Sequence, residues 1–309
     1  MGMKDHDLAM TERLKEDSPL LLLDGPTGTE LERHGFPTNQ ALWSARALVD
    51  APDLLGRIHS EYMDAGADVI TVNSFRTNRR AVVAAGLDGE MAELLTRRAV
   101  HVARRAREAC GRPGILIAGS DAPADDCYTP DAVPDDETLM REHAEHCRWL
   151  AEEGADLILV ETMNTLREAR IACAAAMGCG LPVMVSLVTD ALGDHLLDGT
   201  PLSEAVDALA GLGPAAILTN CSSPRASVRA TEIIAGQRRV LKGKWLFGGY
   251  PNGGEPDAVL GYRKVRTVPL DEFVEAIMRM RALGATVVGN CCGTTPETTR
   301  ALSDALRRS

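Results

Sequence analysis

Aromatic residues and lysines are scarce in this chain of 309 residues. Phe, Trp and Tyr make up 4% of the sequence, whereas hydrophobic residues together make up 45%, so a buried core has to consist mainly of Ala, Val, Leu and Ile. Such small and branched side chains suit barrels and helix-on-sheet layers. The chain holds five lysines, and only Lys244 touches a predicted strand, at its start, which argues against Schiff-base chemistry.

Long apolar runs and basic clusters are also missing. No stretch approaches the roughly 18 apolar residues that a membrane-spanning helix needs. The formal net charge is −11 and no run of Lys or Arg offers a surface to phosphate backbones, so neither a membrane nor a nucleic acid is an expected partner. Residues 1–18 are polar and charged, unlike a secretory leader. We therefore expect a cytoplasmic protein with reduced cysteines that acts on small molecules, and the pattern does not define its oligomeric state.

Short apolar runs alternate with longer helical patterns along the chain. The runs that predict strands are Leu20–Asp24, Asp68–Asn73, Gly114–Gly119, Asp156–Glu161, Pro182–Leu187, Ala215–Asn220, Lys244–Gly249 and Thr286–Gly289. Helices are predicted over Asp88–Cys110, Asp135–Glu153, Thr165–Met177, Leu202–Ala210, Arg225–Ile234, Leu270–Leu283 and Pro296–Arg307. This alternation favours an α/β fold, a single-domain (β/α)8 TIM barrel over residues 18–309, after an N-terminal extension of residues 1–17. A doubly wound open sheet is the alternative, and the absence of G-x-G-x-x-G after the first strand weakens it.

Polar side chains follow several of the predicted strands, where barrel enzymes carry their functional residues. Asp24 ends the first strand, Asn73 the second and Glu161 the fourth. Cys221 follows the sixth strand, and the pair 291–292, two adjacent cysteines, follows the eighth. Three thiols are therefore expected at one mouth of the barrel.

The adjacent cysteines, Cys291 and Cys292, are the most informative pair. Neighbouring side chains on a strand point to opposite faces, so both thiols share one ligand only where the chain turns, and Gly289 and Gly293 permit such a turn. Three thiolates around Zn²⁺ leave the fourth tetrahedral position for a substrate, as in catalytic zinc sites. From the residues alone, a role as small buried hydrophobes stays open. The other cysteines lack this context and are interpreted as packing residues: Cys110, Cys127, Cys147, Cys173 and Cys179.

Several segments resemble the homocysteine S-methyltransferase family, in the same order along the chain. They are LDGPTGTEL at 23–31, NSF at 73–75, GTPL at 199–202, NCSSP at 220–224, YPNGGE at 250–255 and GNCCGT at 289–294. The resemblance covers about residues 18–306, and the combination of N-C-x-x-P with G-x-C-C-G-T is specific. It implies a barrel that binds Zn²⁺ through Cys221, Cys291 and Cys292 and methylates the thiol of L-homocysteine, giving methionine. Coordination to zinc deprotonates a thiol whose ordinary pKa is about 8.5.

The resemblance also implies how the amino acid is held. It assigns Asp24 and Glu161 to the ammonium group of the substrate and the backbone after Asp24 to its carboxylate. The substrate-binding residues expected in all are Asp24, Gly25, Thr27, Asn73, Phe75 and Glu161. Without the family pattern, Asp24 is equally readable as a cap of the next turn and Glu161 as one half of an ion pair on the rim.

The methyl donor and some contacts are less well defined. Pro26 stands where many relatives have glycine, and proline has no N–H to offer to a carboxylate. Arg76 is an alternative receptor for a carboxylate, or a solvated charge. Because the sequence stops just after the barrel and lacks the length of betaine-using relatives, we expect a sulfonium donor, S-methylmethionine or S-adenosylmethionine.

Other functions remain open at this point. The same chemistry on a different thiol or selenol is one, and a zinc-thiolate protein that binds a thiol without turnover is another. A zinc hydrolase is disfavoured because no H-E-x-x-H motif is present, and the lone histidines, such as His59 and His195, have no partner pattern.

Overall fold

Eight parallel strands form the centre of the computed structural model, which describes residues 20–257 and 261–308. They are β1 (Leu21–Leu22), β2 (Val69–Thr71), β3 (Leu116–Asp121), β4 (Leu157–Met163), β5 (Val183–Leu187), β6 (Ala216–Asn220), β7 (Leu246–Tyr250) and β10 (Val287–Val288). Their order in the sheet is β1-β10-β7-β6-β5-β4-β3-β2. A parallel bridge between Leu23 and Val69 joins the two ends of this order, so the sheet closes into a barrel. The predicted N-terminal extension, residues 1–17, lies outside the described residues.

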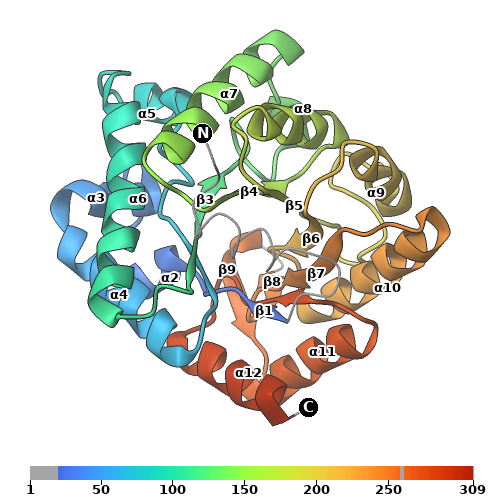
Figure 1. Cartoon of the computed structure of the whole chain (residues 1–309). Helices are drawn as coiled ribbons and strands as arrows, with labels where there is room; N and C mark the ends of the chain where they lie inside the picture. Colours follow the sequence, from blue (N-terminus) through green and yellow to red (C-terminus); the bar gives the residue numbers. More distant parts are fainter. Residues whose placement is uncertain (1–19, 258–260, 309) are drawn as a thin grey trace, which may run out of the picture.

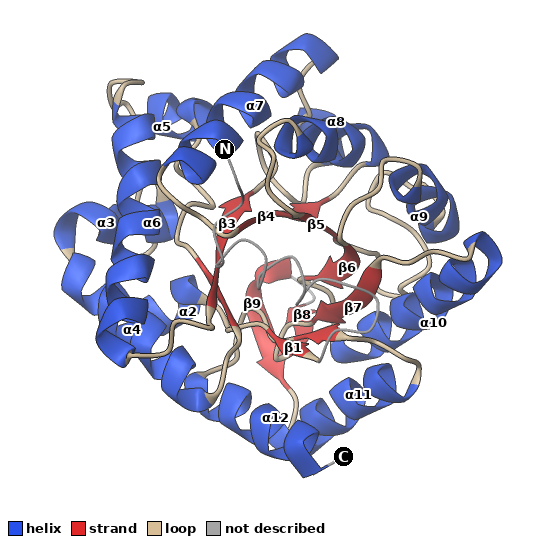
Figure 2. Cartoon of the chain, in the orientation of Figure 1, coloured by secondary structure: helices blue, strands red, loops and turns tan. Residues whose placement is uncertain are grey.

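Helices surround the strands, as Figures 1 and 2 show. They are α2 (Thr27–Arg33), α3 (Ala47–Asp50), α4 (Pro52–Ala65), α5 (Arg79–Ala84), α6 (Met91–Cys110), α7 (Asp136–Glu152), α8 (Leu166–Met177), α9 (Leu202–Ala210), α10 (Pro224–Leu241), α11 (Leu270–Ala282) and α12 (Pro296–Arg308), with short 3₁₀ turns η1 (Trp43–Arg46) and η2 (Pro130–Ala132). The predicted single-domain (β/α)8 barrel is confirmed. Within the described residues, no helix combines the length and apolar character that crossing a bilayer requires.

Four helices and one hairpin depart from the predicted pattern. The helices α2, α3, α4 and α5 were not predicted: α3 and α5 are short, and Gly28 and Gly56 lower the helix propensity of α2 and α4. A two-stranded antiparallel hairpin, β8 (Gly254–Asp257) with β9 (Gly261–Thr267), interrupts the expected passage from β7 to α11. All eight predicted strands are present, and the barrel strands are shorter than predicted at several ends.

Small apolar side chains fill two separate layers of the core. The layer inside the barrel consists of Leu21, Leu23, Val69, Leu116, Ala118, Leu157, Leu159, Met184, Ala216, Leu218, Leu246, Tyr250 and Val287. A larger layer lies between the strands and the helices and is rich in alanine and leucine. Alternation of side chains along each strand separates the two layers, and the filled interior leaves the strand ends as the place for a site.

Candidate active site

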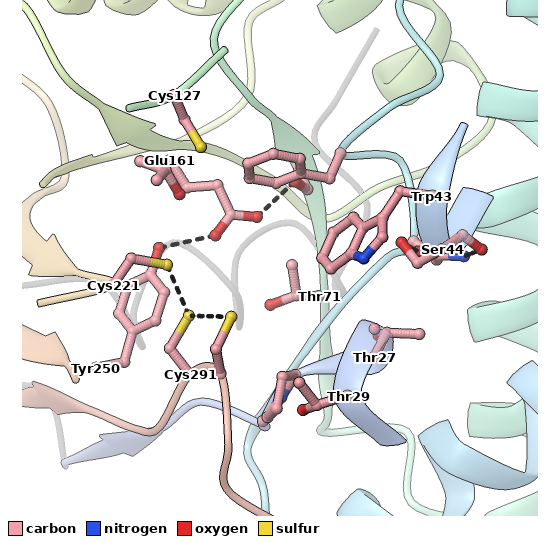
Figure 3. A pocket seen from close by; sticks show the side chains of 18 of the residues that line it. Thr27, Thr29, Trp43, Ser44, Thr71, Cys127, Glu161, Cys221, Tyr250 and Cys291 are labelled. Atoms are coloured by element: carbon pink, nitrogen blue, oxygen red, sulfur yellow. Dashed lines mark hydrogen bonds between the residues drawn. The ribbon is translucent and has the colours of Figure 1, made fainter. Parts of the chain in front are cut away.

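A pocket of about 620 Å³ opens at the carboxyl ends of the strands. The loops that follow β1, β2, β3, β6 and β10 contribute residues to its wall, and β4 and β7 contribute residues from within the strands. Figure 3 shows how Cys221, Glu161 and Tyr250 lie on one side of this pocket and Trp43 on the other. Residues far apart in the sequence thus meet in one space.

Three thiols gather at the floor of the pocket. The Sγ atoms of Cys221 and Cys291 are 2.9 Å apart, and those of Cys291 and Cys292 are 4.0 Å apart. All three Sγ atoms lie within 4.8 Å of one another. Hydrogen bonds from Cys221 and Cys291 hold the pKa of the Cys292 thiol well below its usual range, whereas the pKa values of Cys221 and Cys291 are raised, so the cluster favours a single thiolate, at Cys292.

Local backbone geometry explains how the two cysteine segments turn toward each other. Cys221 leaves β6 with a left-handed φ of 52°, which turns the chain away from the strand. Gly293, with a φ of 79°, makes the turn predicted after the cysteine pair. The backbone N–H of Cys291 donates to the carbonyl of Pro251 at 2.8 Å, so this turn is anchored to the segment after β7.

The thiol cluster fits a zinc ion. Zn–S bonds of about 2.3 Å in a tetrahedron place sulfur atoms about 3.8 Å apart. The 4.0 Å between Cys291 and Cys292 is close to this spacing, and the 2.9 Å between Cys221 and Cys291 is shorter, so Cys221 and Cys291 would move apart around the ion. Cysteine thiolates are ligands that zinc prefers. Cys221, Cys291 and Cys292 are all free cysteines. The described residues offer no fourth Cys, His, Asp or Glu to this group. The donor set is therefore that of a site with one open position.

Asp24 lies buried in the wall of the same pocket, two residues after β1. Its Oδ2 accepts a 2.9 Å hydrogen bond from the backbone N–H of Thr71 in β2. Burial raises the pKa of this carboxyl well above its usual value, and the hydrogen bond from Thr71 offsets only part of that effect. Among the described residues Asp24 has no Lys or Arg partner, so it is a carboxylate that a bound cation would stabilise.

Glu161 is the second buried carboxylate of the pocket. It accepts a 2.5 Å hydrogen bond from Oγ of Ser120 and a 3.2 Å bond from the hydroxyl of Tyr250. Burial raises the pKa of Glu161 to about 7, although both hydrogen bonds oppose that rise. The ion-pair reading of Glu161 finds no cationic partner among the described side chains, and the carboxylate instead faces the pocket (Figure 3).

A strained residue lies beside Glu161. Thr162 has a φ of 61°, which is rare for a β-branched residue, and it sits where the register between β4 and β5 shifts. The side chain of Asn220 holds it there, accepting from the Thr162 N–H at 3.1 Å and donating to Oγ1 at 2.8 Å. Asn220 immediately precedes Cys221, so one amide links β6, which leads into the thiol cluster, to β4, which carries Glu161.

Asn73 and Phe75 both reach the pocket wall, but in different ways. The amide of Asn73 is engaged by Ser44, which donates to its Oδ1 at 2.8 Å and accepts from its Nδ2 at 2.9 Å. Asn73 therefore anchors the segment that carries Trp43. Phe75 packs edge-on against Trp43 with ring centroids 5.9 Å apart, and Arg76 lies over Phe75 at 5.4 Å.

The segment after Asp24 is closely packed at both of its glycines. A Cβ at Gly25 would lie 2.7 Å from the hydroxyl of Tyr62, and one at Gly28 would collide with the indole of Trp43. Only glycine fits at these positions, which places the backbone of Gly25 and Thr27 at the pocket wall.

Sequence reasoning missed several residues of the pocket. Ser120 and Trp43 belong to no motif, and Cys127, interpreted as a packing residue, is buried but lines the pocket. Trp43 follows Leu42, and both have left-handed φ values, 48° and 69°. Such a strained backbone leaves no mark in the sequence, whereas the tyrosine of the YPNGGE segment, Tyr250, was a visible signal.

Three thiols and two buried carboxylates at the mouth of a parallel barrel are side chains expected of an enzyme that acts on small thiols. The comparisons agree: the profile of the homocysteine S-methyltransferase family matches residues 21–306. Homocysteine S-methyltransferase 4 of Zea mays is 31% identical over 96% of this chain and 92% of its own length. Selenocysteine Se-methyltransferase of Brassica oleracea is 32% identical over 97% of this chain and 93% of its own. The metallated form of the Escherichia coli homocysteine methyltransferase MmuM superposes with a TM-score of 0.80 at 29% identity, over 94% and 97% of the two chains.

The chain belongs to the homocysteine S-methyltransferase family. It is accordingly an enzyme, a transferase of one-carbon groups.

Proposed function

We propose that this protein is a zinc-dependent enzyme that transfers a methyl group from a sulfonium donor, S-methylmethionine or S-adenosylmethionine, to L-homocysteine, giving methionine. The observation that carries the proposal is the convergence of three thiols and two buried carboxylates on one pocket. Cys221, Cys291 and Cys292 would hold the Zn²⁺ ion, and the metallated form of the E. coli relative supports a metal here. Bound there, zinc would lower the pKa of the substrate thiol and so provide a thiolate nucleophile.

The two carboxylates would bind the ammonium group of homocysteine. Asp24 and Glu161 are both buried and lack a Lys or Arg partner among the described residues, so an ammonium between them would satisfy both. Ser120 and Tyr250 already fix the orientation of Glu161. A short amino acid pinned in this way would extend its thiol toward the cysteines.

The carboxylate of homocysteine would bind the backbone of Gly25 and Thr27. Pro26 between them offers no N–H, so this contact depends on the two neighbours. Asn73, which we expected to touch the substrate, supports the proposal indirectly, because its amide is committed to Ser44 and so fixes Trp43 in the opposite wall.

A cationic donor fits the other side of the pocket. The rings of Trp43 and Phe75 line it, and aromatic faces attract a sulfonium by the cation–π effect. Four acidic residues in the wall add to that attraction: Asp24, Glu32, Asp126 and Glu161. In the transfer, the thiolate electron pair forms the new S–CH₃ bond while the donor S–CH₃ bond breaks. The donor sulfur keeps that pair and becomes a neutral thioether.

X-ray absorption at the zinc edge would test the proposal, with and without L-homocysteine. We expect three sulfur ligands and one light atom to become four sulfurs when homocysteine is added. A parallel assay with a CD₃-labelled sulfonium should yield labelled methionine by mass spectrometry. Fewer than three sulfurs, or no labelled product with either donor, would contradict the proposal.

A selenol acceptor is the second candidate. A relative at 32% identity is named selenocysteine Se-methyltransferase. The pocket features described above would accept a selenol amino acid as readily as a thiol one, so competition between homocysteine and selenocysteine in the labelled assay distinguishes the two. A thiol-binding protein without turnover would bind homocysteine at zinc but release no labelled product.

The proposal extends to the cellular location and the domain organisation of the protein. We propose a cytoplasmic enzyme of methionine biosynthesis, supported by eight cysteines that are all unpaired. Residues 18–309 would act as one catalytic unit, with residues 1–17 as an extension. A truncated chain starting at residue 18 should retain activity and metal content.

A further inference from the structure

Arg76 is the one cationic side chain among the described residues that line the active-site pocket. It follows Phe75 in the loop after β2, and its guanidinium carbon lies 5.4 Å from the centre of the Phe75 ring. Its Nη1 donates a 2.8 Å hydrogen bond to the backbone carbonyl of Asp125, in the loop after β3. The pocket is otherwise acidic, and the guanidinium of Arg76 is its one positive charge among the described residues. The ring of Phe75 and the carbonyl of Asp125 hold this guanidinium in place.

This positive charge belongs to the wall opposite the thiols. Trp43 stands across the pocket from Cys221 in Figure 3, and Phe75 packs against Trp43 at 5.9 Å. Arg76 stacks on the same Phe75 ring. Cys221, Cys291 and Glu161 thus occupy one side, and two aromatic rings with a guanidinium occupy the other.

The neighbouring arginines show what Arg76 lacks. Arg79 makes a two-pronged ion pair with Glu145, and Arg80 makes one with Glu142. Within the described part of the chain, Arg76 has no acidic side chain at ion-pair distance, and only Nη1 has a described acceptor. A planar guanidinium with unused N–H donors is suited to a bidentate hydrogen bond with a carboxylate.

We propose that Arg76 binds the α-carboxylate of a sulfonium donor that is itself an amino acid. This inference rests on the proposed function, because it needs methyl transfer between two amino acids in one pocket. Each of them brings one carboxylate, and the backbone near Gly25 would serve only the acceptor. The donor sulfonium would lie against Trp43 and Phe75, with its carboxylate on Arg76 and its methyl group toward the thiols.

The same geometry has a simpler reading, in which Arg76 only ties the loop after β2 to the carbonyl of Asp125. The two readings differ in what they expect of a donor without a carboxylate. Loss of a loop anchor weakens every donor alike. Loss of a carboxylate receptor weakens only donors that carry a carboxylate.

The test compares S-methyl-L-methionine with its α-carboxamide, which keeps the sulfonium and the ammonium group. Both are assayed with L-homocysteine on the full-length, zinc-loaded wild type, on Arg76→Met and on Arg76→Lys, and their binding is also measured by calorimetry. Arg76→Met removes the charge at similar volume, and Arg76→Lys keeps the charge but loses the planar fork. Arg98→Met, on the exposed face of α6, controls for the change in net charge.

We expect the KM and Kd of S-methylmethionine to rise about ten- to a hundredfold in Arg76→Met, as for the loss of a charged hydrogen bond. Arg76→Lys should fall between wild type and Arg76→Met. The carboxamide should bind the wild type as weakly as S-methylmethionine binds Arg76→Met, and should respond little to either substitution. Arg98→Met should match the wild type with both donors.

Equal losses for the two donors, or none, would overturn the role of Arg76 in carboxylate binding. If the wild type uses S-adenosylmethionine instead of S-methylmethionine, the same comparison is made with S-adenosylmethionine and its α-carboxamide, and equal losses or none in Arg76→Met would overturn the role of Arg76 while leaving the proposed function intact. Wild-type enzyme that binds zinc and homocysteine but accepts a methyl group from neither donor would instead remove the proposed function, and this inference with it.

Discussion

The hydroxyl of Tyr250, the last residue of β7, donates a 3.2 Å hydrogen bond to Oε2 of Glu161 in β4. Ser120, from β3, donates to the other oxygen of the same carboxylate. Three strands therefore fix the position of one side chain before any ligand arrives. Such prior orientation lowers the entropic cost of binding an ammonium group there.

Replacing Glu161 by Gln should weaken homocysteine binding by about ten- to a hundredfold, because a neutral amide is a poor partner for an ammonium. The Kd of 3-mercaptopropionate, which has a thiol but no amine, should not change. Calorimetry with the two ligands checks this. Equal losses for both ligands would show that Glu161 acts on the pocket as a whole rather than on the amine.

The raised pKa of Glu161 adds a pH dependence. Since burial raises this pKa to about 7, the carboxyl is protonated below pH 7 in the free enzyme and must lose its proton to bind an ammonium. Homocysteine affinity in the wild type should therefore fall more steeply below pH 7 than in Glu161→Gln. The ratio of the two Kd values between pH 5.5 and 8 measures the effect, and a constant ratio would contradict it.

Removal of Cys291 should abolish tight zinc binding, because two thiols cannot hold the ion in the way three do. Cys127→Ala provides a matched control, since Cys127 lines the same pocket but is not a member of the thiol cluster. Metal analysis after dialysis should find about one zinc per chain in the wild type and in Cys127→Ala, and far less in Cys291→Ala. Zinc retained by Cys291→Ala would remove that residue from the ligand set.

His59 should make the fold sensitive to mild acid. It lies fully buried in α4 with neither ring nitrogen hydrogen-bonded to a described residue, and burial lowers its pKa to about 4. Because the pKa of His59 is lower in the folded than in the unfolded state, its contribution to stability is fully present above pH 6.5. That contribution is lost as the pH falls toward 4. The loss amounts to at most about 3 kcal/mol.

Denaturant unfolding between pH 4.5 and 7.5 tests this prediction. Wild type should lose stability across the range more steeply than His59→Leu. His101→Leu, at an exposed position of α6, should behave as the wild type does. Parallel curves for all three proteins would mean that His59 is not protonated on unfolding in this range.

A buried charged group behind the pocket wall should matter for stability in alkali. Asp121 accepts 2.8 Å hydrogen bonds from Nδ1 of both His143 and His146, and Nε2 of His143 lies 3.3 Å from Glu168. Burial alone would lower the pKa of His143, but the charge of Asp121 and these hydrogen bonds outweigh it and raise that pKa to about 10. Stability from this group is present below pH 6.5 and lost as the pH rises toward 10.

Asp121→Asn should cost about 3–5 kcal/mol at pH 7, because it leaves a buried imidazolium without its main partner. Its unfolding free energy should also vary less than that of the wild type between pH 6.5 and 10. Urea unfolding at several pH values measures both effects. A neutral His143 in the wild type at pH 7, seen by NMR, would contradict this account.

The strands and the thiol cluster could be predicted from the sequence, whereas the fine structure of the pocket could not. Most strands are nearly continuous apolar runs, so burial on both faces is visible in the sequence. The Cys221 and Cys291 segments carry specific motifs. Trp43 and Ser120 carry none, because their positions depend on a left-handed backbone and on hydrogen bonds between distant strands.

Asn73 illustrates a different gap between sequence and structure. Its place at a strand end indicates a polar side chain at the mouth, and it is there. Whether its amide meets a ligand or another part of the chain depends on where Ser44 lies, and that position follows from the packing of η1 against the barrel. Strand-end position alone does not contain this information.

The two shortest strands of the barrel are neighbours in the sheet. The two-residue strands β1 and β10 lie side by side, and β10 in turn pairs with β7. Cys221 follows β6, and the other two thiols follow β10, so a shared ion would join the ends of these two strands across β7. At a free zinc concentration a thousand times its Kd, an ion bound there adds about 4 kcal/mol to the free energy of unfolding. Zinc content and resistance to unfolding should then rise together.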